Sequence, residues 1–464
     1  MPLLALLSAL ALAQVDSPAK ASGYLGLRAG WTDGFDANPP PLADLYGVSE
    51  RSLLTEANLQ ARVRLAEGYE IASDLSFFVN SQSDAEGRLG SAPSMGNRFE
   101  PNELYGNLGF CEHANGLIGR KRLVFGSGFA HNPSDLLNPP KDPTDPSLQR
   151  AGAWMVRAEA PFERFTLTAL WAPKVTATEM GLPRRFLAEP GGSGVEQLFG
   201  ARLYALVLGT DLNLIWFFSN RYADSLPHSH RLAASFSRYF FTDYELHAEA
   251  IVQRGSDRVV LRPDCLPGTD GSPEPLLVCR QQGERAVSQP DFDAKALFPK
   301  LIVGTRTTFS DDSTLSLEYD YDATGLSAQQ FDDRQRFLRA LPDATAAAAG
   351  WPPSLRGELP DPRVALGSSQ DSGAPAHFVF APQRRHYLFV VFQKPKIRDD
   401  FAVTATAIVG LEALSALFSP AVAWSAREWL TVSASGYVPV GPSDSEFGSL
   451  PFRFRAILEA KAFF

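Results

Sequence analysis

The chain has 464 residues, of which 45% are hydrophobic, 20% are charged and 11% are aromatic. This composition supports a large buried apolar surface and excludes intrinsic disorder for most of the chain. The 43 Lys and Arg residues are outnumbered by 52 Asp and Glu residues, which gives a net charge of -9. Because the sequence has no extended basic run to offset phosphate repulsion, nucleic acid is excluded as a partner.

The N-terminus carries the pattern of an export signal. Residues 3–12 form an almost unbroken apolar run, and Ala11-Leu12-Ala13 is the small-x-small site that signal peptidase needs. The run is too short to span a bilayer as a helix, and a buried N-terminal helix is the alternative. We expect residues 1–13 to be a signal peptide and residues 14–464 to form the exported protein.

The rest of the chain repeats short segments in which polar and apolar side chains alternate. In residues 58–65 the odd positions are apolar and the even positions are polar or charged, and residues 242–252 and 314–321 repeat the scheme. Such alternation is typical of strands with one face in an apolar medium and the other in water. The pattern predicts about eighteen strands, at residues 22–30, 54–66, 69–79, 103–112, 115–125, 152–160, 164–172, 199–208, 211–219, 230–240, 243–254, 300–310, 313–322, 385–394, 399–410, 415–425, 428–438 and 451–464.

The connections between these segments are sorted by length. Tight turns are expected at residues 67–68, 113–114, 162–163, 209–210, 241–242 and 311–312. The connections between them are long and rich in Pro, Gly and Asp, at residues 31–53, 80–102, 126–151, 173–198, 255–299 and 323–384. Short periplasmic turns at one end and long extracellular loops at the other are the signature of a membrane barrel. We therefore predict an all-β fold, a transmembrane antiparallel β-barrel of about eighteen strands formed by residues 14–464.

The last strand supports this prediction. Residues 452–464 alternate apolar and charged side chains and end on Phe464. The segment resembles the closing strand of bacterial outer-membrane barrels, whose terminal Phe is part of the assembly signal. The resemblance implies that outer-membrane lipid and the barrel-assembly machinery are partners.

Arginine recurs on the polar face of the predicted strands. The arginines are Arg62, Arg64, Arg120, Arg122, Arg157, Arg202, Arg306, Arg453 and Arg455, and acidic residues on other strands include Glu245, Glu249, Glu318 and Asp320. We expect these side chains to line the lumen of the barrel, and structural ion pairs are the alternative. Because the first and last strands pair, the arginines near both chain ends predict one positive wall and a weak anion preference.

The connection at residues 126–151 is unusually stiff. Its first 21 residues, up to Pro146, contain five prolines, which favour an extended path with little entropy to lose on docking. We expect this loop to fold into the barrel and narrow it, with Asn132, Asp135, Asp142 and Asp145 as constriction residues; an ordinary exposed loop is the alternative. The aspartates lack EF-hand spacing, so we predict no metal site.

Cysteine usage fits an oxidising compartment. Cys265 and Cys279 bracket a stretch rich in Pro, Gly and Asp, and we predict that a disulfide closes this loop. Cys111 has no partner nearby in the sequence, and we interpret it as a small residue that is buried or faces lipid.

Two segments resemble a known family. Ile118-Gly-Arg-Lys-Arg-Leu-Val-Phe-Gly-Ser-Gly, continuing to Asp135, and Pro439-Val-Gly-Pro-Ser-Asp-Ser-Glu-Phe-Gly448 are similar to porin-like barrels of Gram-negative bacteria, broadly of the alginate-export type. The resemblance implies a Gly-Arg strand that leads into a loop near the pore, and lumen arginines that accompany the transport of anionic solutes.

These observations favour a passive channel over an enzyme. The sequence has no Gly-x-Ser-x-Gly or His-Glu-x-x-His motif and no Gly-rich phosphate-binding loop. His228-Ser229-His230 with Asp224 could form a catalytic or metal site, but histidines two apart in a Pro-containing loop more often face solvent. We expect an outer-membrane channel for small hydrophilic solutes, anionic ones among them, without a cofactor. The alternative is a structural or surface-interaction barrel with a plugged lumen, whose long loops, notably residues 323–384, bind partners.

Overall fold

The computed structural model describes residues 19–33, 50–83, 89–91, 98–138, 152–175, 195–220, 229–256, 258, 260–267, 272–284, 286–288, 295–348, 383–450 and 452–464. The expected signal peptide, residues 1–13, lies outside these ranges.

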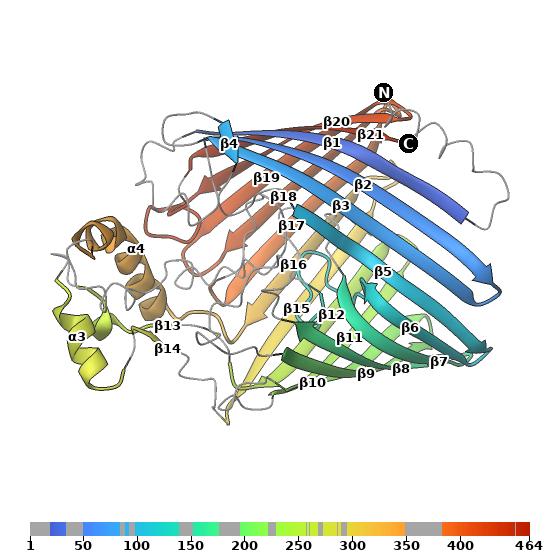
Figure 1. Ribbon diagram of the computed structural model, residues 1–464, viewed down its shortest axis with the longest axis horizontal. Helices are drawn as coiled ribbons and strands as arrows, with labels where there is room; N and C mark the ends of the chain where they lie inside the picture. The colour runs from blue at the N-terminus through green and yellow to red at the C-terminus, as the bar shows by residue number, and fades with distance from the viewer. Residues whose placement is uncertain are drawn as a thin grey trace.

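The described residues form a closed antiparallel β-barrel (Figure 1). One sheet contains nineteen strands, and without the three-residue strand β4 (Leu89–Ser91) eighteen strands form the barrel wall. Each strand pairs with the next along the chain, and β1 also pairs with β21, which closes the barrel. The barrel strands are β1 (Ala19–Asp33), β2 (Arg51–Ala66), β3 (Tyr69–Ser83), β5 (Arg98–Cys111), β6 (Ala114–Lys121), β7 (Ala153–Pro161), β8 (Phe165–Val175), β9 (Val195–Val207), β10 (Thr210–Asn220), β11 (Ser229–Phe240), β12 (Tyr244–Arg254), β15 (Leu297–Thr308), β16 (Thr314–Asp322), β17 (His386–Ile397), β18 (Phe401–Gly410), β19 (Ser415–Arg427), β20 (Leu430–Val440) and β21 (Phe454–Phe463). The predicted barrel and its strand number are confirmed.

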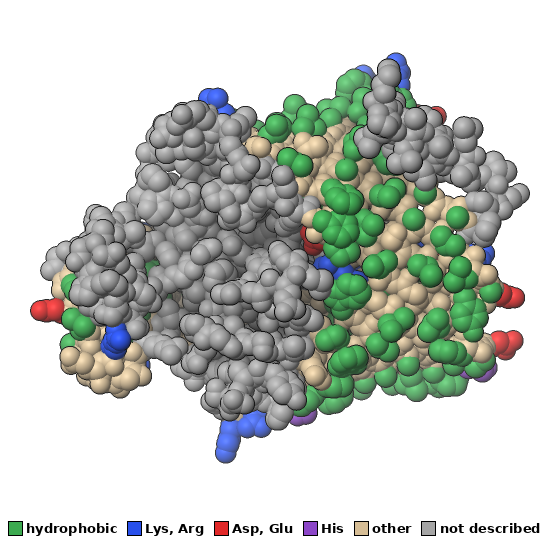
Figure 2. Space-filling model, viewed as in Figure 1, with side chains coloured by type: hydrophobic (Ala, Val, Ile, Leu, Met, Phe, Trp, Pro, Cys, Tyr) green, Lys and Arg blue, Asp and Glu red, His purple; other side chains and the backbone are tan. Residues whose placement is uncertain are grey.

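The two faces of the wall differ in the way that the alternation predicts. In β12, every second residue from His247 to Gln253 is buried on the inner face. Large apolar side chains on the other face are exposed, for example Leu232 at 53% and Leu458 at 56%. Figure 2 shows such hydrophobic side chains spread over the visible outer face of the described strands. A belt of this kind is what a transmembrane barrel presents to lipid.

The short turns lie at one end of the barrel. Gly68 and Gly209 take φ values of 79° and 71°, a left-handed conformation that suits tight hairpins. One short connection, at residues 411–414, lies at the opposite end among the long loops. The sorting of connections by length is therefore confirmed with that one exception.

Helices occur in two of the connections that the sequence analysis interpreted as loops. The helices are α3 (Glu274–Gln281) and α4 (Ala328–Ala348). The connection that contains α3 also contains the 3-10 turn η2 (Pro263–Cys265) and a two-stranded ribbon formed by β13 (Val260–Leu261) and β14 (Val287–Ser288). Figure 1 places α3 and α4 beyond the strand ends, at the end opposite the short turns. Within the described part of the chain, no helix is long and apolar enough to cross a membrane.

Two strand boundaries differ from the prediction. The strand predicted at 115–125 ends at Lys121, because the backbone N–H of Arg122 donates to the Glu103 carboxylate, 2.9 Å away, and the chain leaves the sheet. The strand predicted at 451–464 begins at Phe454. Arg122 and Arg453, which were expected within strands, therefore lie just outside them.

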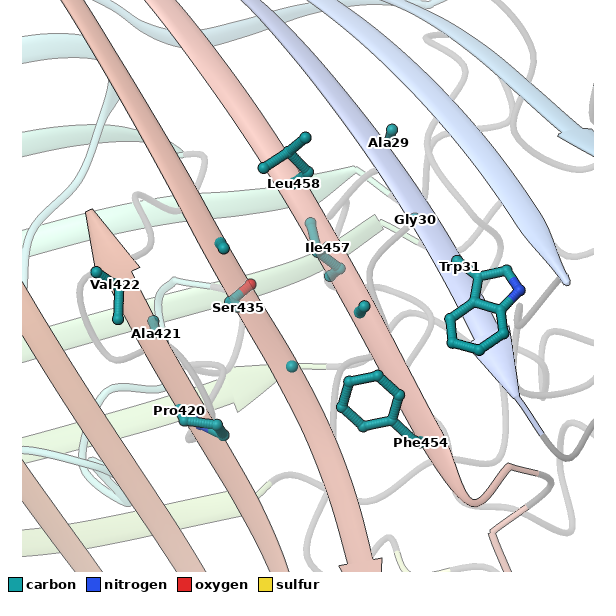
Figure 3. Close-up of a pocket in the computed structure, with 13 residues that line it drawn as sticks. Ala29, Gly30, Trp31, Pro420, Ala421, Val422, Ser435, Phe454, Ile457 and Leu458 are labelled. Atoms are coloured by element: carbon teal, nitrogen blue, oxygen red, sulfur yellow. The ribbon is translucent and has the colours of Figure 1, made fainter. Parts of the chain in front are cut away.

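The seam between β1 and β21 joins the two ends of the chain. Gly23 and Phe464 exchange two backbone hydrogen bonds, of 3.1 and 3.0 Å, and the Arg28 guanidinium pairs with the Glu459 carboxylate at 2.7 Å. On the outer side of this seam, small residues such as Ala29 leave a shallow apolar groove that Trp31 and other residues border (Figure 3). The barrel wall is thus continuous across the point where the chain begins and ends.

Candidate functional site in the barrel interior

Residues 122–138, here called the inward segment, leave β6 and pack inside the barrel. Phe125 is buried in one apolar cluster with Leu117 and Phe217. Ala130 is buried in a second cluster, with Tyr387 and other residues of the strands near the C-terminus. Because the two clusters belong to different parts of the wall, the segment crosses part of the interior.

Two buried carboxylates of the wall hold the backbone of the inward segment. Glu249 of β12 accepts hydrogen bonds from the backbone N–H groups of Ser127, at 2.9 Å, and Ser134, at 2.6 Å. Glu318 of β16 accepts from the backbone N–H of Ala130, at 2.7 Å, and from that of Phe129. Both side chains are almost fully buried, so these bonds offset much of the cost of removing two charges from water.

Two histidines extend this network. His247 of β12 lies with Nε2 2.8 Å from Glu318, and Nδ1 of His131 in the inward segment lies 2.9 Å from Asp320 of β16. Gly304 of β15 makes room for the first pair, because a Cβ atom there would lie 2.3 Å from His247 Nε2. Burial lowers the pKa of His131, but the Asp320 carboxylate more than offsets this, so the pKa lies above its ordinary value.

Within the inward segment, polar side chains stabilise its own turns. Asn132 donates to the backbone carbonyl of Phe125 at 3.1 Å, and Asn138 donates to the Asp135 carboxylate at 2.9 Å. Asn132 and Asp135, two of the four predicted constriction residues, are therefore buried in the fold of the segment. The other two, Asp142 and Asp145, lie outside the described residues.

Three of the arginines near the chain ends form ion pairs with acidic residues. Arg122 lies 3.1 Å from Asp74 of β3, and Arg120 lies 3.8 Å from Glu100 of β5. Arg62 pairs with Glu70 at 3.6 Å. The prediction of one positive wall is therefore wrong, because period-2 alternation shows which side chains face inward but not that carboxylates of neighbouring strands are interleaved with them.

Two other arginines lie beside the rings of the inward segment. The Arg202 guanidinium of β9 is 5.7 Å from the Phe125 ring and donates to Asn213 at 2.8 Å, and Arg306 of β15 is 5.6 Å from the Phe129 ring. Among the residues that the structure describes, neither has a carboxylate within ion-pair distance. Each still has an acidic neighbour beyond ion-pair distance: Glu159 interacts electrostatically with Arg202, and Glu245 is the cross-strand partner of Arg306.

The remaining predicted lumen residues occupy varied positions. Arg157 pairs with Glu159 at 3.4 Å, and Glu245 accepts from Ser237 at 2.7 Å. Arg455 is buried, whereas Arg64 and Arg453 are exposed near opposite ends of the barrel.

Two of the three cysteines form a disulfide, and the third is a free thiol. A disulfide joins Cys265 to Cys279, whose Cα atoms are 5.6 Å apart, and ties η2 to α3. With Glu284 they form a group of possible metal ligands within the described ranges, but both sulfur atoms are used in the disulfide. Cys111 is exposed at the end of β5.

Of the predicted histidine motif, the structure describes only Ser229 and His230. His230 lies in β11, with its ring 4.9 Å from that of Phe218 and 6.0 Å from that of Trp216. His228 and Asp224 lie outside the described residues.

The barrel is similar to solved porin structures. OccAB1 of Acinetobacter baumannii aligns with a TM-score of 0.50 and 9% identity, over 96% of this chain and 96% of that chain. OprB of Pseudomonas putida gives 0.40 and 11%, over 96% and 93%, and a mutant of the Rh. blastica porin gives 0.40 and 9%, over 96% and 100%. No protein-family model matches the chain, and no curated protein matches it. The chain is a transmembrane β-barrel with the fold of an outer-membrane porin.

Proposed function

We propose that the protein is a non-enzymatic channel of the outer membrane through which small hydrophilic solutes diffuse passively. The observation that carries the proposal is a closed barrel with an apolar outer belt and charged side chains on its inner face. A polar interior enclosed by an apolar wall is the arrangement that conducts water-soluble molecules across lipid.

The inward segment is proposed as the constriction of this channel. Its backbone is fixed by Glu249 and Glu318 from strands that lie far from β6 in the sequence, so it narrows the space between them. A rigidly held segment of this kind excludes solutes by size. The Gly-Arg strand that leads into it supports a relationship to the alginate-export type of porin.

We further propose a weak preference for anionic solutes. Arg202 and Arg306 support it, because both lie on the inner face beside the constriction and, among the described residues, neither forms an ion pair with a carboxylate. Guanidinium groups stay charged at all physiological pH values and can hold a carboxylate or phosphate in a bidentate manner.

Planar lipid bilayer recordings test the channel. We expect purified protein to produce discrete conductance steps, and heat-denatured protein to produce none. The absence of steps at every voltage would instead favour the plugged barrel whose surface loops bind partners.

Selectivity is tested by the double variant Arg202→Gln with Arg306→Gln. In a salt gradient, its zero-current potential should shift toward cation preference, because two lumen cations are removed. The control is Arg238→Gln, which removes an exposed arginine beside the Phe240 ring near a short turn and should leave the potential unchanged. Arg120 and Arg122 are poorer test positions, since their removal also takes a cation away from Glu100 and Asp74. An unchanged potential in the conducting double variant would refute the preference.

A further inference from the structure

Glu446 joins the segments that pack at the extracellular end of the barrel. It lies in the connection between β20 and β21, at residues 441–453, and is buried there. The Tyr387 hydroxyl of β17 donates to its two carboxylate oxygens at 2.8 and 2.7 Å, and the backbone N–H of Gln383 donates at 2.9 Å. One carboxylate therefore connects this segment to the start of β17.

The same connection is attached to α4. Gln335 of α4 donates to the Ser449 hydroxyl at 3.0 Å, and Arg339 of α4 donates to the Ser443 carbonyl at 3.4 Å. Phe447, directly after Glu446, is fully buried in the apolar cluster that also holds Ala130 of the inward segment. Glu446 thus lies between a helix at the mouth and the proposed constriction.

Two cations face Glu446 from the elements around it. Arg334 comes from α4, and Arg384 from the residues before β17. Arg384 also pairs with the Glu412 carboxylate at 2.8 Å and lies 4.9 Å from the Phe331 ring of α4. The carboxylate is therefore surrounded by one tyrosine, two arginines and apolar side chains, with α4 supplying part of the enclosure.

Burial makes this carboxyl group sensitive to protons near neutral pH. Removal from water raises its pKa from the ordinary 4.5 to about 7, although Tyr387, Gln383 and the arginines favour the charged form. A group with a raised pKa stabilises the enclosed state at acid pH, when it is neutral, and destabilises that state once it is ionised.

We propose that Glu446 is a proton-controlled latch on the extracellular mouth of the channel: protonation keeps α4 and residues 441–450 packed together, and ionisation loosens them. This rests on the proposed channel function. The pKa of Glu446 is about 7 in the enclosed state and 4.5, the ordinary value, once the segments separate. Between these two pH values the equilibrium constant for loosening rises about tenfold per pH unit, or roughly 300-fold in total. Acid therefore closes the mouth, and neutral to alkaline pH opens it.

Conductance as a function of pH tests the latch. In bilayers at high salt, the wild-type channel should conduct least near pH 5 and reach a plateau above pH 7. Glu446→Gln keeps a neutral, hydrogen-bonding side chain, so it should hold the low conductance at every pH. Asp444→Asn is the matched control, since it removes an exposed carboxylate from the same connection and should keep the wild-type profile. A wild-type pH profile in the Glu446→Gln variant would overturn the proposal.

A cross-link tests whether α4 is the moving part. The Gln335 side chain reaches the Ser449 hydroxyl, so in the double variant Gln335→Cys with Ser449→Cys a short bis-methanethiosulfonate reagent should join the two thiols through reducible disulfides. The cross-linked form should remain at low conductance at pH 8 and open after reduction, while wild-type protein treated with the same reagents keeps its own profile. A cross-linked form that opens with pH as the wild type does would overturn the latch.

Hydrogen exchange separates a failed latch from a failed channel. Peptides that cover residues 328–338 should exchange faster in wild-type protein than in Glu446→Gln at pH 8, and equally fast at pH 5. Comparison at the same pH removes the intrinsic pH dependence of exchange. Equal exchange at both pH values would overturn the latch, whether or not the protein conducts.

Discussion

Gly126 has a backbone conformation and surroundings that exclude a side chain. Its φ is 88°, and a Cβ atom would lie 2.0 Å from Oε2 of Glu249. We expect Gly126→Ala to release the inward segment, because the left-handed conformation costs an alanine about 1–2 kcal/mol and the clash adds to this. Single-channel conductance should rise.

The control for that variant is Gly209→Ala in the short turn after β9. Gly209 also has a positive φ, of 71°, but nothing lies near its missing Cβ. Gly209→Ala therefore places an alanine in the left-handed conformation without a steric clash, and this variant should conduct as the wild type does. If both variants conduct like the wild type, the anchoring of the inward segment by Glu249 does not control the pore.

His131 gives the inward segment its own pH dependence. Because its pKa is raised, the ion pair with Asp320 contributes fully below the ordinary value of 6.5 and is lost as pH rises through the raised value. We expect the wild type to be more heat-stable than His131→Gln by about 1–3 kcal/mol at pH 6, and the difference to shrink toward pH 9. Calorimetry at several pH values measures this, and a difference that grows with pH would contradict it.

Among the elements, α4 had a local sequence signal that strand periodicity does not reveal. Ser327 and Gln330 form a reciprocal capping box, with hydrogen bonds of 2.9 and 3.3 Å, directly at the start of the helix. The Ser-x-x-Gln spacing and the following helix-forming residues could have predicted α4. Its contact with Ser449 could not be predicted, because it joins residues 114 positions apart.

For the inward segment too, the local sequence predicts the type of structure but not its long-range contacts. Its prolines and glycines indicate a stiff, special loop, and alternation places Glu249 and Glu318 on the inner face. What alternation does not provide is the partner of each carboxylate. Glu249 and Ser127 are 122 residues apart, and their pairing depends on how the closed wall positions β6 relative to β12.

The folded structure around α3, in the connection between β12 and β15, depends on the disulfide. The bond closes a short loop between Cys265 and Cys279, which in a chain-entropy treatment contributes about 3 kcal/mol. In Cys265→Ser with Cys279→Ser, we expect protease sensitivity near α3 but an unchanged heat stability of the barrel. Non-reducing peptide mapping of the wild type should recover the linked pair. Two free thiols there, or a barrel that melts early in the variant, would contradict the expectation.

For the whole molecule, the sequence predicted the architecture better than the interior. Period-2 alternation and connection lengths are repeated in every strand, so local errors such as the end of β6 at Lys121 do not change the fold. The predicted positive wall failed because charges are neutralised by neighbouring strands, as Arg122 is by Asp74. Pairing of this kind depends on register, which composition does not specify.

Removal of β21 should prevent the barrel from closing. A chain ending at residue 450 leaves β1 and β20 each with one unpaired edge, and unpaired edges associate with other chains. We expect such a variant to aggregate and to lack the fast-migrating folded band on unheated gels. Deletion of residues 268–272 in the α3 region leaves every barrel strand paired and serves as the control. A folded, detergent-soluble truncation would show that β21 is dispensable.

The seam between β1 and β21 also has a kinetic consequence. Arg28 and Glu459, which meet there, are 431 residues apart, so this contact forms only after almost the entire chain has been synthesised. Contacts of such separation carry a large loop-closure entropy and are slow to form. Until then the growing sheet has two open edges, each able to capture another chain. We therefore expect the yield of folded protein to depend on how quickly the first strand meets the last.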